Sequence, residues 1–154
     1  MPNLASHIDV LRAHRDHFGW ILETFRGQIA RLPECGRILA RTESDALRRV
    51  LCAGIGRVVV AVPRGDDDGL IGWAASIDGR LVFAYVRELL RHKGIGGELI
   101  AAVVDLAPVE AAYWTPDAEA MQARGYPIGY SIKAHRSLLA YARESKPLCE
   151  RLVA

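Results

Sequence analysis

The chain has 154 residues, of which 51% are hydrophobic and 25% are charged, and its formal net charge is +2. This composition predicts one globular domain over residues 1–154 with a sizeable core, and the charge is too small to indicate a nucleic-acid-binding protein. No apolar run approaches the roughly 18 residues that span a bilayer. MPNLASHIDV has neither the basic nor the apolar segment of a secretory leader, so we expect a cytoplasmic protein.

The first third of the chain predicts one strand and two helices. The strand is expected over residues 7–13, where apolar and polar side chains alternate. Asp16 is expected to cap a helix whose apolar stripe includes Phe18, Ile21, Leu22, Phe25 and Ile29. After the breakers Pro33 and Gly36, Ser44 is expected to cap a second helix, ALRRVLCAG, which Gly54 closes.

The middle of the chain predicts three strands. They cover residues 57–63, 70–77 and 80–86, and Asp78-Gly79 between the last two is a strong hairpin signal. The acidic run Asp66-Asp67-Asp68-Gly69 between the first two lacks the spacing of a calcium loop and indicates a solvated turn.

Helix and strand patterns alternate in the last third. A helix over residues 94–107 should turn Leu99, Ile100, Val103 and Leu106 inward, and a strand should follow over residues 109–114. A short helix starting at Thr115, a strand over residues 127–132 and a C-terminal helix from Ser137 complete the order. This order predicts an α+β fold, in which helices flank a mixed, mostly antiparallel sheet.

The cysteine and histidine spacings predict no metal site. Cys35, Cys52 and Cys149 are odd in number and form no CxxC pair, which is typical of reduced thiols. The five histidines show no HExxH or similar ligand spacing.

The segment RHKGIGG, residues 91–97, places three basic side chains and three glycines between a predicted strand and a predicted helix. The first amides of a helix lack partners inside it, and the helix dipole attracts an anion there. Glycines let that anion approach the backbone. The segment therefore predicts a phosphate or pyrophosphate site. It is neither a GxxxxGK[ST] loop nor a GxGxxG fingerprint, because Leu99 stands where the third glycine belongs.

The wider string YVRELLRHKGIGGELI resembles the signature of the GCN5-related N-acetyltransferase (GNAT) superfamily, a strand ending in valine followed by [RQ]-x-x-G-x-[GA]. Val86 matches the valine, and Arg91, Gly94 and Gly96 match the loop. The resemblance extends loosely over residues 57–132. It implies a sheet splayed in its middle and acetyl-CoA as a co-substrate, with no metal.

The resemblance also implies roles for individual residues. Tyr85 and Val86 would contact the pantetheine of coenzyme A. The loop would hold the pyrophosphate through Arg91, His92, Lys93, Gly94, Ile95, Gly96 and Gly97.

The catalytic half of the family pattern is altered. Arg80 and Val82 stand where a base is often found, and Met121 stands where a tyrosine usually protonates the departing thiolate. Tyr113 and Tyr126 are the substitutes that the sequence offers as catalytic residues. Each has an ordinary alternative as a packing aromatic.

The sequence therefore leaves two functions open. The first is an N-acetyltransferase that moves an acetyl group directly from acetyl-CoA to a small-molecule or peptide amine. The second is a catalytically silent protein of the same fold that binds CoA or a partner. Nucleic-acid modification lacks a basic face to support it. The apolar positions of the C-terminal segment fit packing on its own sheet or on a second copy, so a homodimer also stays open.

Overall fold

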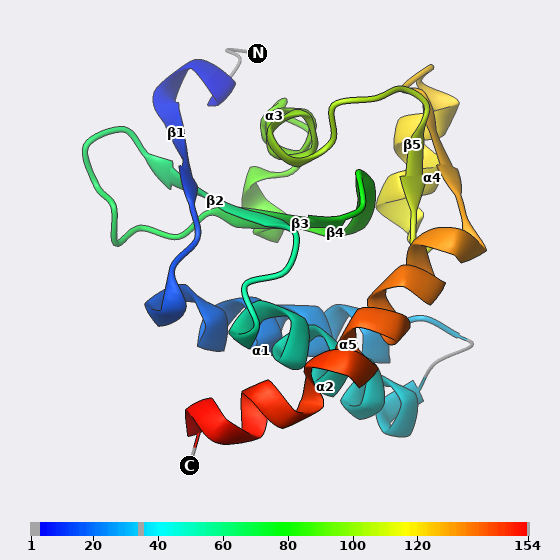
Figure 1. The fold of residues 1–154 in the computed structure, drawn as a ribbon. Coiled ribbons are helices and arrows are strands. Elements are labelled where there is room, and N and C mark those ends of the chain that lie inside the picture. Colours follow the sequence, from blue (N-terminus) through cyan, green and yellow to red (C-terminus); the bar gives the residue numbers. More distant parts are fainter. Residues whose placement is uncertain (1–3, 34–35, 154) are drawn as a thin grey trace.

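The computed structural model describes residues 4–33 and 36–153. Within them, six strands form one sheet in the order of the chain, with helices on both faces (Figure 1). The strands are β1 (Ile8–Arg12), β2 (Arg57–Pro63), β3 (Gly72–Ile77), β4 (Arg80–Val86), β5 (Val109–Ala111) and β6 (Ile128–Tyr130). The α-helices are α1 (Phe18–Ala30), α2 (Gly36–Cys52), α3 (Ile95–Val103), α4 (Pro116–Ala123) and α5 (Ile132–Val153). Short 3-10 helices are η1 (Leu4–His7), η2 (Arg15–His17) and η3 (Glu88–Leu90).

Strands β1 to β4 form an antiparallel meander. β2 is the β-branched run RVVVAVP, which favours an extended, half-buried surface. Between β3 and β4, Asp78 (φ 53°) and Gly79 (φ 74°) both adopt left-handed conformations, as a tight two-residue hairpin requires. The predicted hairpin and the predicted bounds of β2 and β4 are confirmed.

The sheet changes character beyond β4. β5 runs parallel to β4, and their pairing in the described chain is confined to one position, Leu81 opposite Ala111. β6 then pairs with β5, also in parallel. Past the Leu81 position the two strands diverge (Figure 1), so the sheet is splayed between β4 and β5. The predicted α+β class, a mixed and mostly antiparallel sheet flanked by helices, is confirmed.

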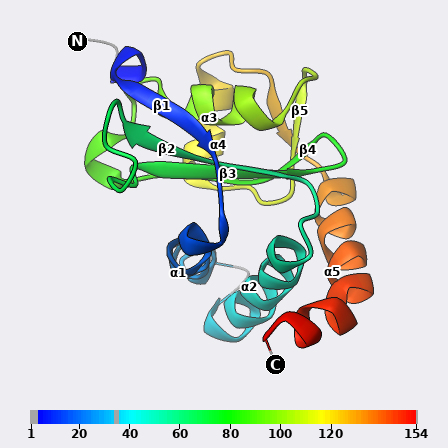
Figure 2. The same cartoon turned by 60° about the vertical axis from the view of Figure 1, so that its left-hand side comes forward.

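Two cores lie on opposite faces of this sheet. Helices α1, α2 and α5 cover one face, and α3 and α4 cover the other (Figure 2). Trp73 and Phe25 are fully buried in the first core, where the Trp73 indole N–H donates to Thr24 Oγ1 at 2.8 Å. The inward stripe of α3, including Leu99 and Ile100, fills the second core. Each helix therefore buries the apolar face that its sequence pattern indicates.

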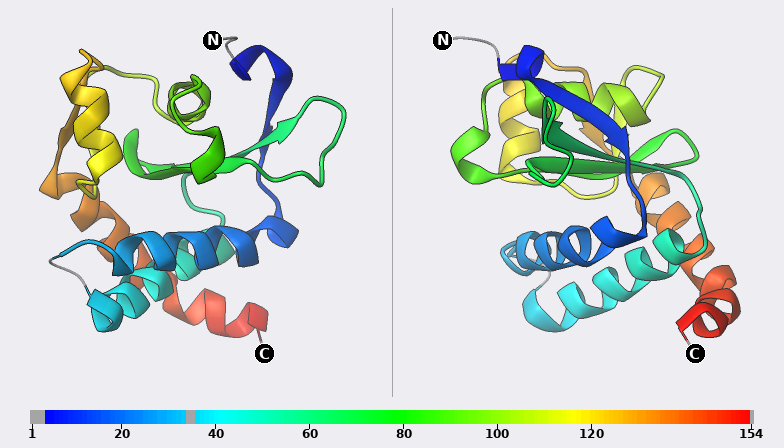
Figure 3. Two further views of the ribbon diagram at one scale, coloured as in Figure 1. Left: turned by 180° about the vertical axis from the view of Figure 1, so that it is seen from behind. Right: turned by 90° about the vertical axis from the view of Figure 1, so that its left-hand side faces the viewer.

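The N-terminal ends of three helices differ from the prediction. α1 is preceded by η2, whose N-cap is His14, and the N-cap position of α1 is His17 rather than Asp16. α2 begins at Gly36, so Ser44 lies inside the helix, because Ala40 already belongs to its buried face. α5 begins at Ile132 instead of Ser137, and its early residue Ala134 packs in the first core, as Leu138 does one turn later. Figure 3 shows α5 alongside α2.

α3 and β5, which follow one another along the chain, end earlier than predicted. α3 ends at Val103, and Val104 is already extended (φ −122°, ψ 119°) as the chain turns toward β5. Leu106 therefore lies outside the helix and is 77% exposed, so its predicted inward position was wrong. β5 ends at Ala111, which leaves Tyr113 and Trp114 in the connection to α4.

Two further findings bear on the composition. Cys52 is a free, half-buried thiol, whereas Cys35 and the side chain of Cys149 lie outside what the structure describes. Across the described helices, none combines the length and the apolarity that crossing a bilayer requires.

Candidate functional site

A cleft opens where β4 and β5 diverge, and it consists of two adjoining cavities. The larger, here called the loop cavity, has a volume of about 550 Å³. The smaller, the α1 cavity, measures about 340 Å³ and reaches the end of α1. Both are lined by Ala84, Val86, Arg91 and Asp117. These four residues mark the junction of the two cavities.

The backbone of β4 faces this junction. The N–H of Arg87 donates to the carbonyl of Ile71 and so points toward the β3 side of the sheet. Backbone groups alternate in direction along an antiparallel strand, so the N–H and C=O of Val86 point away from β3. They meet the gap in which β5 no longer pairs with β4. An extended ligand in the cleft would therefore find strand-like hydrogen-bonding partners at Val86.

The loop of residues 91–97 forms one end of the loop cavity. His92 (φ 63°) and Gly94 (φ 87°) adopt left-handed conformations, and α3 begins at Ile95 without a side-chain cap. Such a curled backbone at a helix start directs several N–H groups into one concavity that suits an anion. A Cβ added at Gly96 would meet Val86 Cγ2 at 3.9 Å and no closer atom outside its own neighbourhood. That vacant position keeps the amides accessible.

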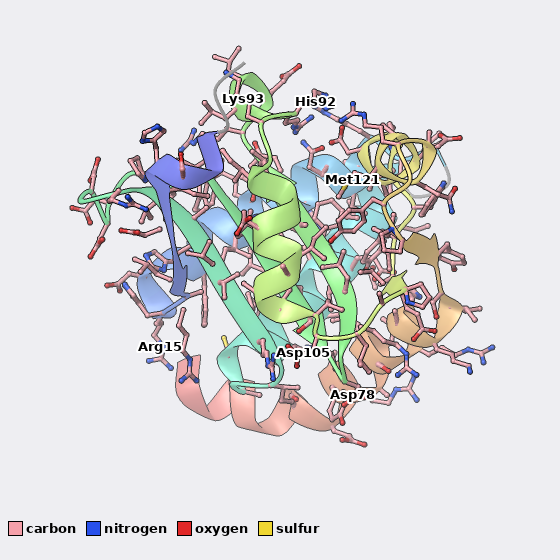
Figure 4. All side chains as sticks on the ribbon, turned by 90° about the horizontal axis from the view of Figure 1, so that it is seen from above. Arg15, Asp78, His92, Lys93, Asp105 and Met121 are labelled. Atoms are coloured by element: carbon pink, nitrogen blue, oxygen red, sulfur yellow. The ribbon has the colours of Figure 1, made fainter. Side chains whose placement is uncertain are left out.

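Most of the predicted cofactor-binding residues come together at this cleft. Val86, Arg91, His92, Gly94, Gly96 and Gly97 line the loop cavity, and Tyr85 lines the α1 cavity. Two do not line either cavity. Ile95 is 1% exposed and packs in the second core, and Lys93 lies just before the start of α3, beside His92 (Figure 4).

Arg91 lies across the junction. Its Nε donates to the Val86 carbonyl at 2.8 Å, and its Nη1 lies 3.5 Å from Asp117 Oδ2 on α4. Its guanidinium carbon lies 5.6 Å from the centre of the Tyr85 ring. One side chain thus connects β4, the loop and α4, with only 20% of its surface exposed.

A second basic contact spans the mouth of the loop cavity. Arg124, just after α4, donates from Nη2 to His92 Nδ1 at 3.1 Å. Both residues line the cavity. Arg124 after α4 and Arg91 of the loop both line this cavity, so positive charge enters it from two elements, which favours an anionic ligand.

Tyr126 and Met121 line the loop cavity together. Met121 lies on the side of α4 that faces α3 (Figure 4). Its thioether cannot donate a proton, in keeping with the altered family position. Burial raises the pKa of the Tyr126 hydroxyl above its ordinary value of 10.0. That hydroxyl is therefore protonated at neutral pH and available as a donor.

The structure separates Tyr113 from this cleft. Its ring packs in the first core against Phe25 and Phe83, and it lines neither cavity. Its hydroxyl donates to Glu43 Oε2 at 2.6 Å. His135 Nε2 lies 3.0 Å from both oxygens of the same carboxylate. The two predicted catalytic tyrosines therefore lie on different faces of the sheet.

Opposing effects set the charges of this cluster. Burial opposes ionisation of Glu43, but the hydrogen bonds from His135 and Tyr113 outweigh it, so the pKa of Glu43 lies below its ordinary value. The hydrogen bond to Glu43 raises the pKa of His135 despite its burial. Glu43 and His135 thus stabilise each other as an ion pair.

The positions where the family often carries a base hold no proton acceptor. Val82 is 2% exposed in the first core, and Arg80 Nε donates to Glu110 Oε2 at 2.9 Å. In the part of the chain that the structure describes, no three His, Cys, Asp or Glu side chains cluster as metal ligands would.

Three charged cleft residues on or just after α4 were not predicted from the sequence. Asp117 and Glu119 line the α1 cavity from the first turn of α4, and Arg124 lines the loop cavity. Thr115, whose Oγ1 accepts from the Ala118 N–H at 3.1 Å, correctly signalled the start of this helix. Thr115 indicates where the helix begins but not which of its faces lines the cleft. Asp117 and Glu119 therefore could not be assigned to the site from the sequence.

Comparisons with known proteins find similarity among solved structures alone. The chain matches no protein-family model and no curated protein sequence. Among solved structures it is similar to the aminoglycoside N-acetyltransferase AAC(6')-Iy in complex with CoA, at 22% identity and a TM-score of 0.45, over 78% of this chain and 88% of that one. The same enzyme with a bisubstrate analogue, CoA-S-monomethyl-acetylneamine, is 21% identical with a TM-score of 0.46, over 78% of this chain and 90% of that one. A GNAT-family acetyltransferase from Staphylococcus aureus Mu50 is 20% identical with a TM-score of 0.46, over 62% of each chain.

The similarity is to GNAT acetyltransferases. Identities of 20–22% do not by themselves establish an activity for this chain.

Proposed function

We propose that the chain is an acyl-CoA-dependent N-acyltransferase that transfers an acetyl group from acetyl-CoA directly to an amine. The observation that carries the proposal is the continuity of the cleft: the loop cavity meets the α1 cavity beside the open backbone edge of Val86. A thioester must be reached from two sides, by its carrier and by its acceptor. Two cavities that meet at one strand edge provide both approaches.

The loop cavity fits the carrier. The curled amides around Gly94 and Gly96 suit the diphosphate, and Arg91 and Arg124 add positive charge to the cavity. The backbone of Val86 suits the amide groups of pantetheine, as a neighbouring strand would. The GNAT resemblance supports the same assignment for Arg91, His92, Lys93, Gly94, Ile95, Gly96 and Gly97, with Ile95 acting through its backbone.

The chemistry follows from what meets at the junction. The amine nitrogen attacks the thioester carbon, and the oxyanion that forms can accept from the Val86 N–H. The carbon–sulfur bond then breaks, the nitrogen loses a proton and the thiolate gains one, leaving an amide and free CoA. Tyr126 is the acid that we propose for the thiolate, since its hydroxyl is protonated and lines the loop cavity. Tyr113 is the weaker candidate, because Glu43 engages its hydroxyl.

A second function has a specific observation behind it. Met121 occupies the cleft where the family tyrosine is expected, and Val82 is buried where a base is expected. A protein that binds CoA without turning it over would need neither group. Release of free thiol from acetyl-CoA, assayed against a panel of small amines and peptides, distinguishes the two. CoA binding without thiol release across that panel would favour the silent protein.

The substitution Gly96→Glu tests the cofactor site itself. The new side chain would project toward Val86 without meeting backbone, so the fold should persist while a carboxylate enters the phosphate site. CoA at one hundred times its Kd should stabilise the native protein by about 2.7 kcal/mol, which corresponds to a rise in Tm of roughly 5–10 °C. We expect the variant to lose this rise.

The matched control is Gly19→Glu. Gly19 lies on α1, lines neither cavity and also has open space at its Cβ. This variant carries the same change in charge and should keep the full response to CoA. A folded Gly96→Glu protein that CoA still stabilises would show that the loop is not the phosphate site.

A further inference from the structure

The guanidinium of Arg91 lies at the junction of the two cavities. It is attached to one wall through Val86 and to the other through Asp117, and it lines both cavities. A guanidinium is a rigid planar group with five N–H donors, so two partners on opposite sides fix its position. The Tyr85 ring below it restricts it further. In this arrangement the junction is bridged by protein.

The proposed substrate would need that same space. An acyl chain that runs from the loop cavity to the α1 cavity has to pass Val86, whose carbonyl the Arg91 Nε occupies. Pantetheine amides would compete for this acceptor. Arg91 therefore cannot keep its present contacts while a thioester reaches an amine in the α1 cavity.

A better partner for Arg91 would arrive with the ligand. Arg91 is the first residue of the loop of residues 91–97, so a diphosphate bound there would lie close to its side chain. A diphosphate offers bidentate, charge-assisted hydrogen bonds, which are stronger than a neutral carbonyl or a half-exposed carboxylate at 3.5 Å provides. The Asp117 side chain is 53% exposed, so the bond to be broken is weak.

We infer that the Arg91–Asp117 ion pair is a latch that closes the junction in the ligand-free protein, and that CoA opens it by drawing Arg91 to the diphosphate. The inference rests on the proposed function. Opening frees the Val86 carbonyl for pantetheine and exposes the Asp117 carboxylate to the α1 cavity, where it attracts a cationic amine.

The test is the affinity for CoA of Asp117→Asn, measured by titration calorimetry at low ionic strength. The substitution removes the ion pair but leaves Arg91 and the loop intact. Because CoA no longer has to break the pair, the variant should bind CoA about two- to fivefold more tightly than the native chain, the range expected for one partly exposed ion pair.

Glu119→Gln is the matched control. Glu119 also lines the α1 cavity from the first turn of α4, and among the described residues it has no ion pair. It removes the same charge near an anionic ligand, so a purely long-range effect would tighten both variants equally. We expect Glu119→Gln to change the affinity clearly less than Asp117→Asn does.

The outcomes distinguish a failure of the latch from a failure of the proposed function. If the native chain binds CoA and Asp117→Asn binds it equally or more weakly, or no more tightly than Glu119→Gln, the latch is refuted while the proposed function stands. If the folded native chain binds no CoA at all, the proposed function fails and the latch falls with it.

Discussion

Tyr126 and Tyr113 show how far one residue's surroundings decide what it can do. Both carry a hydroxyl group, but Tyr126 lines the loop cavity, whereas the Tyr113 hydroxyl donates to the Glu43 carboxylate on the other face of the sheet. A tyrosine committed to a buried carboxylate contributes to stability, and one that faces a cleft is available for proton transfer.

The substitution Tyr126→Phe should expose this difference. If Tyr126 protonates the thiolate, its loss should lower kcat at saturating acetyl-CoA by about 10²-fold, the lower range for general acid catalysis. CoA affinity should change little, because the ring remains. Tyr113→Phe should instead act on stability, lowering the free energy of unfolding by about 1 kcal/mol.

Thiol release and thermal unfolding of both variants, measured with any amine that the native protein acetylates, give the comparison. A drop in kcat for Tyr113→Phe alone would reassign the acid. Unchanged turnover in both would leave proton transfer to water.

The sequence predicted the binding residues better than the catalytic ones. Glycines and basic residues cluster locally at the start of α3, so the seven residues 91–97 alone indicate an anion site. Asp117 and Arg91 meet only because α4 lies across the gap from β4, and no local pattern encodes that approach. Whether Tyr113 faces the cleft or the opposite core depended on the strand ending at Ala111, which the sequence did not indicate.

At the level of elements, a buried polar cluster joins α2, α5 and the end of β5. Glu43 of α2 accepts from Tyr113 and from His135 of α5, and its side chain is 13% exposed. Removing one partner from such a cluster leaves the others unsatisfied, which is costlier than the net value of the bonds. The cluster therefore stabilises the docking of α5 on α2.

Glu43→Gln should lower the free energy of unfolding by about 1–3 kcal/mol, with a defined pH dependence. The pKa of Glu43 is lowered, so its contribution is complete above the ordinary value of 4.5 and declines as the pH falls through the lowered value. The pKa of His135 is raised, so its contribution is complete below 6.5 and declines as the pH rises through the raised value.

The stability difference between the native chain and Glu43→Gln should therefore be largest between pH 4.5 and 6.5. Denaturant unfolding across this range and on either side measures it. Glu23→Gln, an exposed position on α1, should show no such maximum. A difference that is flat with pH would mean that the cluster is not held by charge.

Elements were predictable where a single local signal dominates. β2 and β4 matched to the residue because a β-branched run and an Asp-Gly turn leave few alternatives. α2 and α5 begin earlier than predicted because packing on the first core decides where those helices start.

On the scale of the whole molecule, the two cores share one sheet. Leu99 of α3 and Leu138 of α5 are both fully buried, one on each face. The strands between them contribute to both cores, so neither face can unfold without exposing the sheet surface of the other. We infer that the chain unfolds as a single cooperative unit.

Leu99→Ala and Leu138→Ala test whether the chain unfolds as a single cooperative unit. Each should lower the free energy of unfolding by about 2–5 kcal/mol, as large-to-small changes in a packed core do. Each should also keep one transition that circular dichroism and tryptophan fluorescence report at the same midpoint. Two separated transitions in either variant would show that the faces are independent folding units.

The loop cavity offers its ligand mainly main-chain groups, and this has a consequence for how such a protein changes over generations. Every amino acid supplies the same amide, so most replacements there alter nothing that the ligand meets, while bulk at Gly96 or loss of the left-handed turn at Gly94 is selected against. The α1 cavity is assembled from side chains of α1, β4 and α4, each replaceable singly. Selection therefore constrains the loop cavity at few positions and the α1 cavity at many. The amine acceptor can change during evolution while the acyl-CoA donor stays the same.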